Sequence, residues 1–269
     1  MTMAAILDGL SCLNVKAALL ALRRPGQLRK YISRTLQNYE ELAGEGLPCR
    51  GPVTPSEDMT VTIPAYHAGG GMSFDELVVL ARATKVVNPK TIFEMGSYNG
   101  LTTALFVLNS SFDAKIFTLD LPPETAQNDS LLRSDSKLVA NRQLLAVPQA
   151  LGLSRYTMLL CDSMKFDPTP YQNSVDLGLV DAAHDLEHVR NDTEKMAQMM
   201  SQNGMVFWHD YGGKGNLRPL ATYLEGLSKH CPLFRVPGTT LAWGEASGLK
   251  KLFGHDKPKA SQREMAYTA

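Results

Sequence analysis

Acidic residues stand at the ends of five apolar runs of strand length. These residues are Glu94, Asp120, Asp162, Asp181 and Asp210. In an open α/β sheet ligands bind beyond the carboxyl ends of the strands, so we expect the five acids to surround one ligand site. A buried carboxylate is costly unless it is paired, hydrogen-bonded or bound to a metal. Turns that use an Asp side chain explain one or two of the five, but the full set indicates a functional site.

The stretch TIFEMGSYNG, residues 91–100, predicts a buried strand followed by a tight turn. Gly96 and Gly100 allow unusual backbone angles there and a close approach of the backbone to a ligand. The N–H groups at the start of the next helix face the same place. Glu94 favours a ligand that carries a cation or hydroxyls over a pyrophosphate. The glycine spacing also differs from the G-x-G-x-x-G of dinucleotide sites, which argues against an NAD-dependent oxidoreductase.

At this stretch the sequence resembles the class I S-adenosylmethionine (SAM) dependent methyltransferases. The resemblance implies that Glu94 and the glycine turn hold the methionine part and its sulfonium, and that Asp120 accepts hydrogen bonds from the ribose hydroxyls. The pair Asp162 and Ser163 would meet the adenine amino group. The residues expected to bind the cofactor are Glu94, Gly96, Ser97, Gly100, Asp120, Asp162, Ser163 and Asp181.

Two further stretches, VDAAHDLEHV and GMVFWHDYGG, resemble a smaller group of SAM O-methyltransferases, the macrocin and cephalosporin-tailoring type. Their pattern is D-x-x-H-x-x-E followed by W/F-x-D-Y. The resemblance implies that Asp181 and Asp210 bind Mg²⁺ and that His184 is the general base. His209 stands where relatives often carry Asp, Glu or another ligand, so it is the third candidate for the metal.

These residue types suit the methylation of a hydroxyl on a small metabolite. A hydroxyl is a poor nucleophile until its proton is removed, and a hard divalent cation with oxygen ligands lowers its pKa. A histidine with a pKa near neutral can accept the proton. Methyl transfer is then an in-line displacement at the sulfonium carbon, assisted mostly by alignment.

Two other functions compete with this interpretation. Residues 184–188, HDLEH, fit the inverted zinc-peptidase motif H-x-x-E-H, and two histidines four apart on a helix could bind zinc. The stretch follows a buried strand directly, and D-x-x-H-x-x-E already accounts for His184 and Glu187. A non-catalytic scaffold with the same fold would bind SAM without turnover. The presence of His184 together with Asp181 and Asp210 counts against it.

Apolar runs of strand length alternate with helical stretches, which predicts βαβ units and a parallel sheet covered on both faces. Strands are expected at 91–95, 116–120, 156–162, 175–181 and 205–210, and helices at 101–109, 136–150, 185–201 and 216–230. Ser73 and Glu76 form a capping-box pattern that opens one more helix, which ends before Pro89. Two last strands, LFRVPG and TTLAWGE, predict a terminal antiparallel hairpin.

Together with this pattern, the resemblance implies a Rossmann-like, doubly wound and mostly parallel seven-stranded sheet with a terminal antiparallel hairpin. We assign residues 1–71 to an N-terminal helical cap and linker, 72–246 to the SAM-binding methyltransferase domain, and 247–269 to a disordered tail. The tail has little apolar periodicity, which is typical of disorder.

The amino-acid composition limits which kinds of binding partner are expected. The 269 residues carry 27 basic and 27 acidic side chains, so the chain has no excess of positive charge for binding nucleic acid. A small hydroxylated acceptor is expected instead. The four cysteines are scattered, which indicates a reducing, cytoplasmic location. No apolar run approaches the length of about 18 residues that a membrane span needs. Amphipathic N-terminal stretches are compatible with a homodimer.

Overall fold

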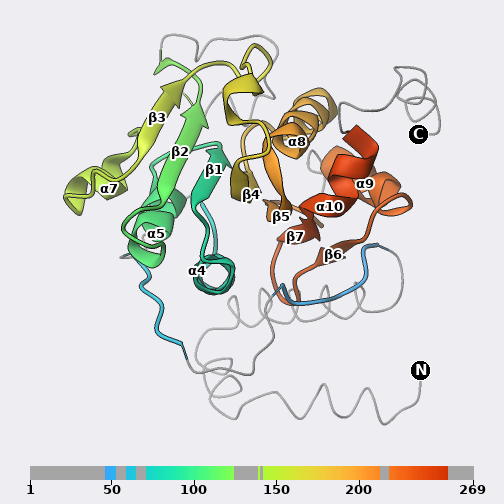
Figure 1. Cartoon of the computed structure of the whole chain (residues 1–269), viewed down its shortest axis with the longest axis horizontal. Coiled ribbons are helices and arrows are strands. Elements are labelled where there is room, and N and C mark those ends of the chain that lie inside the picture. Colours follow the sequence, from blue (N-terminus) through green and yellow to red (C-terminus); the bar gives the residue numbers. More distant parts are fainter. Residues whose placement is uncertain are drawn as a thin grey trace, which may run out of the picture. The chain divides into compact units, whose positions relative to one another are not determined.

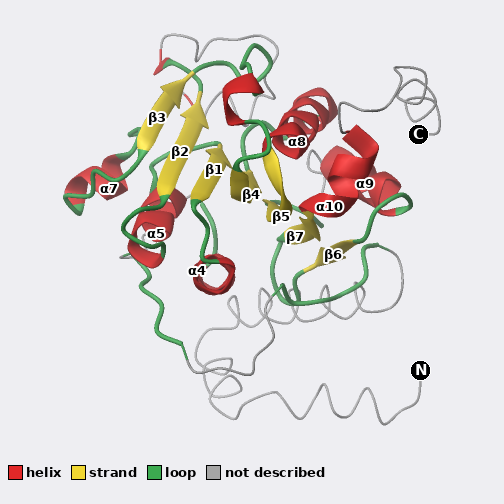
Figure 2. Cartoon of the chain, viewed as in Figure 1, coloured by secondary structure: helices red, strands yellow, loops and turns green. Residues whose placement is uncertain are grey.

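A seven-stranded sheet with helices on both faces forms the part of the chain that the structure describes (Figures 1 and 2). The structure is a computed structural model, and it describes residues 46–52, 59–64, 71–123, 139, 142–212 and 218–253. Contacts divide the chain into Met1–Gly46 and Leu47–Ala269, whereas the sequence predicts a boundary after residue 71. Most of the expected helical cap lies outside the described residues.

The strand order in the sheet is β3-β2-β1-β4-β5-β7-β6. Figure 1 shows the strands side by side in this order. The first five strands pair in parallel, and β7 pairs antiparallel with both β5 and β6. The predicted Rossmann-like fold with its terminal antiparallel hairpin is therefore confirmed. The strands are β1 (Thr91–Met95), β2 (Lys115–Asp120), β3 (Thr157–Leu160), β4 (Val175–Val180), β5 (Met200–Trp208), β6 (Leu233–Arg235) and β7 (Ala242–Glu245).

Each face of the sheet has its own hydrophobic core, because neighbouring residues of a strand point to opposite faces. Ile92 packs in the cluster that contains residues of α4 and α5, and Phe93 packs in the cluster that contains residues of α8, α9 and α10. Both side chains are fully buried. The helices are α4 (Phe74–Val87), α5 (Leu101–Asn109), α7 (Ala146–Ala150), α8 (Leu186–Met199), α9 (Arg218–Ser228) and α10 (Ala246–Phe253), with a 3-10 turn η2 (Thr169–Tyr171).

The structure differs from the sequence prediction in the bounds of α7, which begins at Ala146 rather than 136, in those of β5, which begins at Met200 rather than 205, and at the C-terminal end of the domain. The tail expected from residue 247 begins instead as helix α10, whose Ala246 and Leu249 are fully buried. Leu252 and Phe253 pack against the same core. This amphipathic stretch is only two turns long, so its periodicity was too short to be recognised. Residues 254–269 lie outside the described residues.

Helix α4 begins with the predicted capping box. The Ser73 hydroxyl accepts a hydrogen bond from the Glu76 N–H at 3.4 Å, and Glu76 Oε2 accepts one from the Ser73 N–H at 2.7 Å. The other oxygen of Glu76 accepts from both the backbone N–H and the hydroxyl of Thr240, each at 2.7 Å. Glu76 therefore connects the start of α4 to the turn between β6 and β7, 164 residues later in the chain.

The turn between β1 and α5 fits tightly against the ends of β2 and β4. The N–H of Gly96 donates to the Leu119 carbonyl at 2.8 Å, and the N–H of Asp181 donates to the Met95 carbonyl at 2.8 Å. Gly96 has a φ of +97°, and a Cβ at this position would lie 1.9 Å from the Asp181 carbonyl oxygen. Only glycine satisfies both the backbone angle and the close approach.

Glu94 lies beneath this turn and is fully buried. Its Oε2 accepts hydrogen bonds from Thr103 Oγ1 at 2.5 Å and from Thr118 Oγ1 at 2.7 Å. Burial raises the pKa of Glu94 to about 8, although the two hydroxyl donors act in the opposite direction. The carboxyl group is therefore mostly protonated at neutral pH.

We expect Gly96→Ala to destabilise the domain strongly, because the added Cβ would collide with the Asp181 carbonyl oxygen. The free energy of unfolding should fall by more than about 3 kcal/mol. Gly238→Ala is the matched control, since Gly238 also has a positive φ, +73°, but no atom lies within 4 Å of its Cβ position. That variant should lose about 1 kcal/mol. Urea unfolding measures both, and equal losses would contradict the close-contact argument.

We expect Glu94→Gln to reduce the pH dependence of stability. Because the pKa of Glu94 is raised in the folded state, its contribution to stability is complete below the ordinary value of 4.5 and is lost as the pH rises toward about 8. At about 1.4 kcal/mol per pKa unit, the wild type should lose on the order of a few kcal/mol across this window relative to the variant. Urea unfolding at several pH values measures the difference. Glu245→Gln, at an exposed glutamate, should leave the wild-type slope unchanged.

Candidate functional site

A cavity of about 360 Å³ opens at the carboxyl ends of the parallel strands. Each of the five parallel strands contributes to its lining, either at its own end or in the loop that follows. Four of the five predicted acids reach the cavity wall: Asp120, Asp162, Asp181 and Asp210. Glu94 does not, because its side chain points under the turn toward Thr103 and Thr118. The sheet thus brings most of the predicted acids into one site.

The predicted cofactor residues divide into two groups. Those that line the cavity are Gly96, Asp120, Asp162, Ser163 and Asp181. Ser97 is buried, and its hydroxyl forms a short hydrogen bond with the hydroxyl of Thr118 instead of facing the cavity. Gly100 is the N-cap of α5 with a φ of +80°, and it packs against Pro148. Ser97, Gly100 and Glu94 therefore support the turn on the side that faces away from the cavity.

The carboxylate of Asp120 is surrounded by donors. Its Oδ2 accepts from the backbone N–H groups of Ser97 and Tyr98, at 3.2 and 2.8 Å, and its Oδ1 accepts from that of Leu121 at 2.7 Å. Arg142 Nη1 lies 3.0 Å from Oδ1, and the Arg142 side chain is only 4% exposed. These four contacts use about all the acceptor positions of a carboxylate. Burial raises the pKa of Asp120, and the charge of Arg142 opposes this shift.

Arg142 has no sequence signal that would have revealed it. Arg142 follows Asp120 by 22 positions and belongs to a stretch of the sequence that contains no recognisable motif. Its guanidinium also donates to the carbonyl of Leu121 through a short hydrogen bond. The cavity wall therefore contains a buried cation next to Asp120.

Helix α8 holds the loop after β3 in place. Asp162 Oδ1 accepts from the Met164 N–H at 2.9 Å. The carbonyl oxygen of Ser163 accepts from Asn191 Nδ2 at 3.0 Å and from Lys195 Nζ at 2.6 Å. Because both donors belong to α8, the loop that lines the cavity is fixed to a rigid element.

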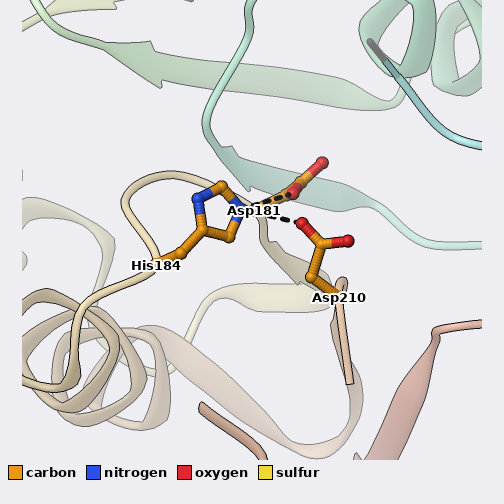
Figure 3. Close-up of side chains that lie close together, drawn as sticks. All are labelled: Asp181, His184 and Asp210. Atoms are coloured by element: carbon orange, nitrogen blue, oxygen red, sulfur yellow. Dashed lines mark ion pairs between the residues drawn. The ribbon is translucent and has the colours of Figure 1, made fainter. Parts of the chain in front are cut away.

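Asp181, His184 and Asp210 converge at the ends of β4 and β5 (Figure 3). His184 Nε2 lies 3.0 Å from Asp210 Oδ2 and 3.9 Å from Asp181 Oδ1. Each of the three side chains offers one ligand atom, and these atoms lie within 4.8 Å of one another. Figure 3 shows one ring nitrogen of His184 directed to both carboxylates, with the other on the opposite side of the ring.

His209 lies between carboxylates as well. Its Nδ1 is 3.0 Å from Asp181 Oδ1 and 3.6 Å from Asp210 Oδ2, and its Nε2 is 3.4 Å from Glu76 Oε2. Burial acts to lower the pKa of His209, but the charge of Asp181 and the hydrogen bonds to Asp181 and Glu76 raise it well above its usual value. Burial acts to raise the pKa values of Asp181 and Glu76, and His209 lowers both. A charged imidazole between the carboxylates accounts for all three shifts.

Glu76 is a site residue that the sequence did not reveal as such. The capping box already explains an acidic residue at this position. Nothing in the local sequence pattern indicates that Glu76 also contacts His209, 133 residues away. The Glu76 side chain is 5% exposed. The signal that could have found it is its acidity on the inward face of α4, next to apolar Leu77 and Leu80.

The zinc-peptidase motif does not form a metal site in the described part of the chain. Asp185 is the N-cap of α8, so His184 precedes the helix, and His188 lies in its first turn. The two histidines are therefore not one helical turn apart on a common face. His188 Nδ1 pairs with Asp185 Oδ2 at 2.7 Å, and Glu187 is exposed. Of the residues that the structure describes, only Asp181, His184 and Asp210 bring three His, Cys, Asp or Glu ligand atoms close enough together to hold a metal ion.

Among the described residues, the helices are all too short or too polar to cross a membrane.

Comparison with known proteins gives one family and many structures. The model of a family described as a methyltransferase domain matches residues 93–211. The O-methyltransferase TomG from Streptomyces achromogenes, involved in tomaymycin synthesis and solved with SAM, has 12% identity and a TM-score of 0.50. The alignment covers 66% of this chain and 82% of TomG. No curated protein matches the chain.

Two more solved structures share the fold. The methyltransferase PaMTH1 from Podospora anserina, bound to S-adenosylhomocysteine (SAH), has 16% identity and a TM-score of 0.50, with 64% of this chain and 78% of that chain covered. A putative caffeoyl-CoA O-methyltransferase from Staphylococcus aureus has 13% identity and a TM-score of 0.50, with 65% and 85% covered. At these identities the likeness to the solved structures shows the fold alone. Residues 93–211 therefore match a methyltransferase-domain family, and the sheet that contains them has the fold of SAM-dependent methyltransferases.

Proposed function

We propose that the enzyme transfers the methyl group of SAM to a hydroxyl of a small molecule. The observation that carries this proposal is the pair of His184 and Asp210, 3.0 Å apart, in the same cavity as Asp120 and Asp162. A histidine held by a carboxylate is suited to remove a hydroxyl proton. The cavity volume of about 360 Å³ suits a small ligand.

The nucleoside half of SAM is assigned to the ends of β1, β2 and β3. Asp120 is the acceptor for the ribose hydroxyls, and Asp162 with Ser163 faces the adenine. Because the oxygens of Asp120 already have four donors, a ribose hydroxyl must replace Arg142 Nη1 at Oδ1 or share that oxygen with it. Gly96 lets the backbone approach the methionine part, which lies toward β4.

The reacting end of the site is assigned to β4 and β5. The acceptor oxygen attacks the methyl carbon, the bond from that carbon to sulfur breaks, and SAH leaves. The His184 imidazole takes the hydroxyl proton, and Asp210 at 3.0 Å stabilises the imidazolium that forms. Asp181 and His209 complete this end of the cavity, and their opposite charges offset each other at 3.0 Å.

Mg²⁺ is the ion that the family resemblance implies, and the residues fit it poorly. Mg²⁺ takes oxygen ligands almost alone and usually keeps several waters. Here the two carboxylates are flanked by the ring nitrogens of His184 and His209. No step of the proposed reaction depends on Mg²⁺. The predictions of a cytoplasmic location and of a homodimer rest on the sequence alone and stay predictions.

We expect Asp120→Asn to weaken SAH binding by at least about tenfold, because the amide loses the charge and part of the acceptor capacity that the ribose needs. Calorimetric titration of the purified protein with SAH measures the change. Asp113→Asn is the control, since Asp113 is exposed in the turn before β2. Equal affinity in the wild type and Asp120→Asn would remove Asp120 from the ribose site. An absence of SAH binding in the wild type would overturn the assigned cofactor site as a whole.

We expect His184→Ala to bind SAH with the wild-type affinity and to lose turnover by about 10²–10⁴-fold, the usual contribution of a general base. A screen of hydroxylated acceptors with radiolabelled SAM supplies the assay. His230→Ala, at an exposed histidine after α9, should keep full activity. Full activity of His184→Ala would refute the assignment of the base. SAH binding without turnover of any acceptor by the wild type would favour a scaffold.

A further inference from the structure

His188 lines the cavity, and the proposed reaction does not use it. It stands in the first turn of α8, and its side chain is 8% exposed. Its Nδ1 is buried and lies 2.7 Å from Asp185 Oδ2. The other ring nitrogen, Nε2, has no hydrogen-bond or ion-pair partner in the described part of the chain. Because Nδ1 is the covered nitrogen, Nε2 is the one that a ligand in the cavity can reach.

Asp185 fixes the tautomer of this ring. Two lone pairs at 2.7 Å would repel each other, so the ring proton belongs on Nδ1, toward the carboxylate. In the neutral ring Nε2 is then an acceptor only. Asp185 is itself held in place, because its Oδ1 caps α8 by accepting from the N–H groups of Glu187 and His188, both at 3.1 Å. The cavity therefore contains a hydrogen-bond acceptor with a fixed orientation.

Helix α8 places this acceptor beside the loop that follows β3. His188, Asn191 and Lys195 are three and seven positions apart, which puts them on one face of the helix. Asn191 and Lys195 both donate to the carbonyl oxygen of Ser163 in that loop. His188 stands one turn nearer the start of α8, and it lines the same cavity as Ser163. The ring therefore belongs to the end of the cavity that is assigned to the adenine.

The exocyclic amino group of adenine offers two N–H donors. Asp162, the acid assigned to this group, can accept one of them, because its Oδ1 uses one position for the Met164 N–H and a carboxylate has about four positions. The second N–H needs another acceptor, and His188 Nε2 supplies one. Hypoxanthine, the deaminated base, carries a carbonyl oxygen at the same position. Two fixed acceptors would then face a third acceptor, which costs affinity.

We propose that His188, oriented by Asp185, accepts a hydrogen bond from the amino group of the cofactor's adenine and thereby excludes the deaminated base. The inference rests on the proposed function for the position of the adenine. His188 is in this view a specificity-determining residue that contacts the cofactor, and Asp185 is a positioning residue that acts through it. The role proposed for His184 is unchanged.

The affinities of SAH and S-inosylhomocysteine, the analogue in which hypoxanthine replaces adenine, test the inference. Calorimetric titrations in slightly alkaline buffer give their ratio, which a general disturbance of the pocket would leave unchanged. We expect His188→Leu to lower the preference for SAH by about 10–100-fold, because leucine fills similar space without an acceptor. His230→Leu, at an exposed histidine, should keep the wild-type ratio. A wild-type ratio in folded His188→Leu would overturn the inference.

Asp185→Asn tests the positioning role and preserves the helix cap, since Asn caps helices as well as Asp does. The amide oxygen must stay at the two capping N–H groups, so the amide NH₂ is left to donate to His188 Nδ1. This moves the ring proton to Nε2, which becomes a donor toward the base. The preference for SAH should fall at least as far as in His188→Leu. The wild-type ratio in Asp185→Asn would contradict the role of Asp185.

The wild-type protein offers a test that does not depend on the folding of a variant. In ¹⁵N NMR of labelled histidine, His188 should show a protonated Nδ1 and an unprotonated Nε2, assigned through its own backbone signals. Saturation with SAH should shift the Nε2 signal toward that of a protonated nitrogen, because a hydrogen bond to the lone pair acts in this direction. An Nε2 signal that stays in place with SAH bound would overturn the inference.

The outcomes for the base and for the reaction are separable. If the wild type does not bind SAH, the proposed cofactor site fails. If SAH binds and the ratio of affinities is the same in the wild type and His188→Leu, the proposed function stands and only the role of His188 falls. The readouts are affinities and chemical shifts, so neither depends on turnover or on the methyl acceptor.

Discussion

The close contact between Gly96 and the carbonyl of Asp181 is the constraint on which the site depends. It fixes the distance between the turn after β1 and the end of β4, with no room for a Cβ. The same turn is held on its other side by the hydrogen bond from the Gly96 N–H to the Leu119 carbonyl at the end of β2. The ends of β1, β2 and β4 are therefore held together by the protein's own contacts, without a ligand. Asp120 and Asp181, the acids that end β2 and follow β4, face one cavity because the backbone around them is held together.

A site with so many acidic side chains is stable because the surrounding residues compensate each carboxyl group in a different way. Glu94 is kept neutral by burial and by two hydroxyl donors. Asp120 has three backbone donors and a buried arginine, and Asp181 has His209. Asp162 is tied to the backbone of its own loop. Uncompensated carboxylates this close together would repel one another and raise the free energy of the fold.

The sequence predicted features that are local and missed those that join distant parts of the chain. The strand ends, their acids and the capping box of α4 follow from short patterns, and the structure has them where they were expected. Arg142 and the contact between Glu76 and His209 could not be predicted, because no local pattern distinguishes an arginine in a loop or a capping glutamate from many others. Ser97 and Glu94 were assigned to the ligand side of the turn. Their burial depends on how the turn folds over α5 and β2, which spacing alone does not reveal.

The same long-range contacts explain why the site needs the whole sheet domain. Glu76 comes from the helix that precedes β1, and Thr240, which binds it, comes from the turn of the last hairpin. His209, which directly follows strand β5, contacts the other carboxylate oxygen of Glu76. The orientation of the His209 ring is therefore set jointly by the first and the last elements of the domain. A site assembled in this way acquires its final geometry only when β7 has paired with β5, so the terminal hairpin is part of the functional machinery as well as the edge of the sheet.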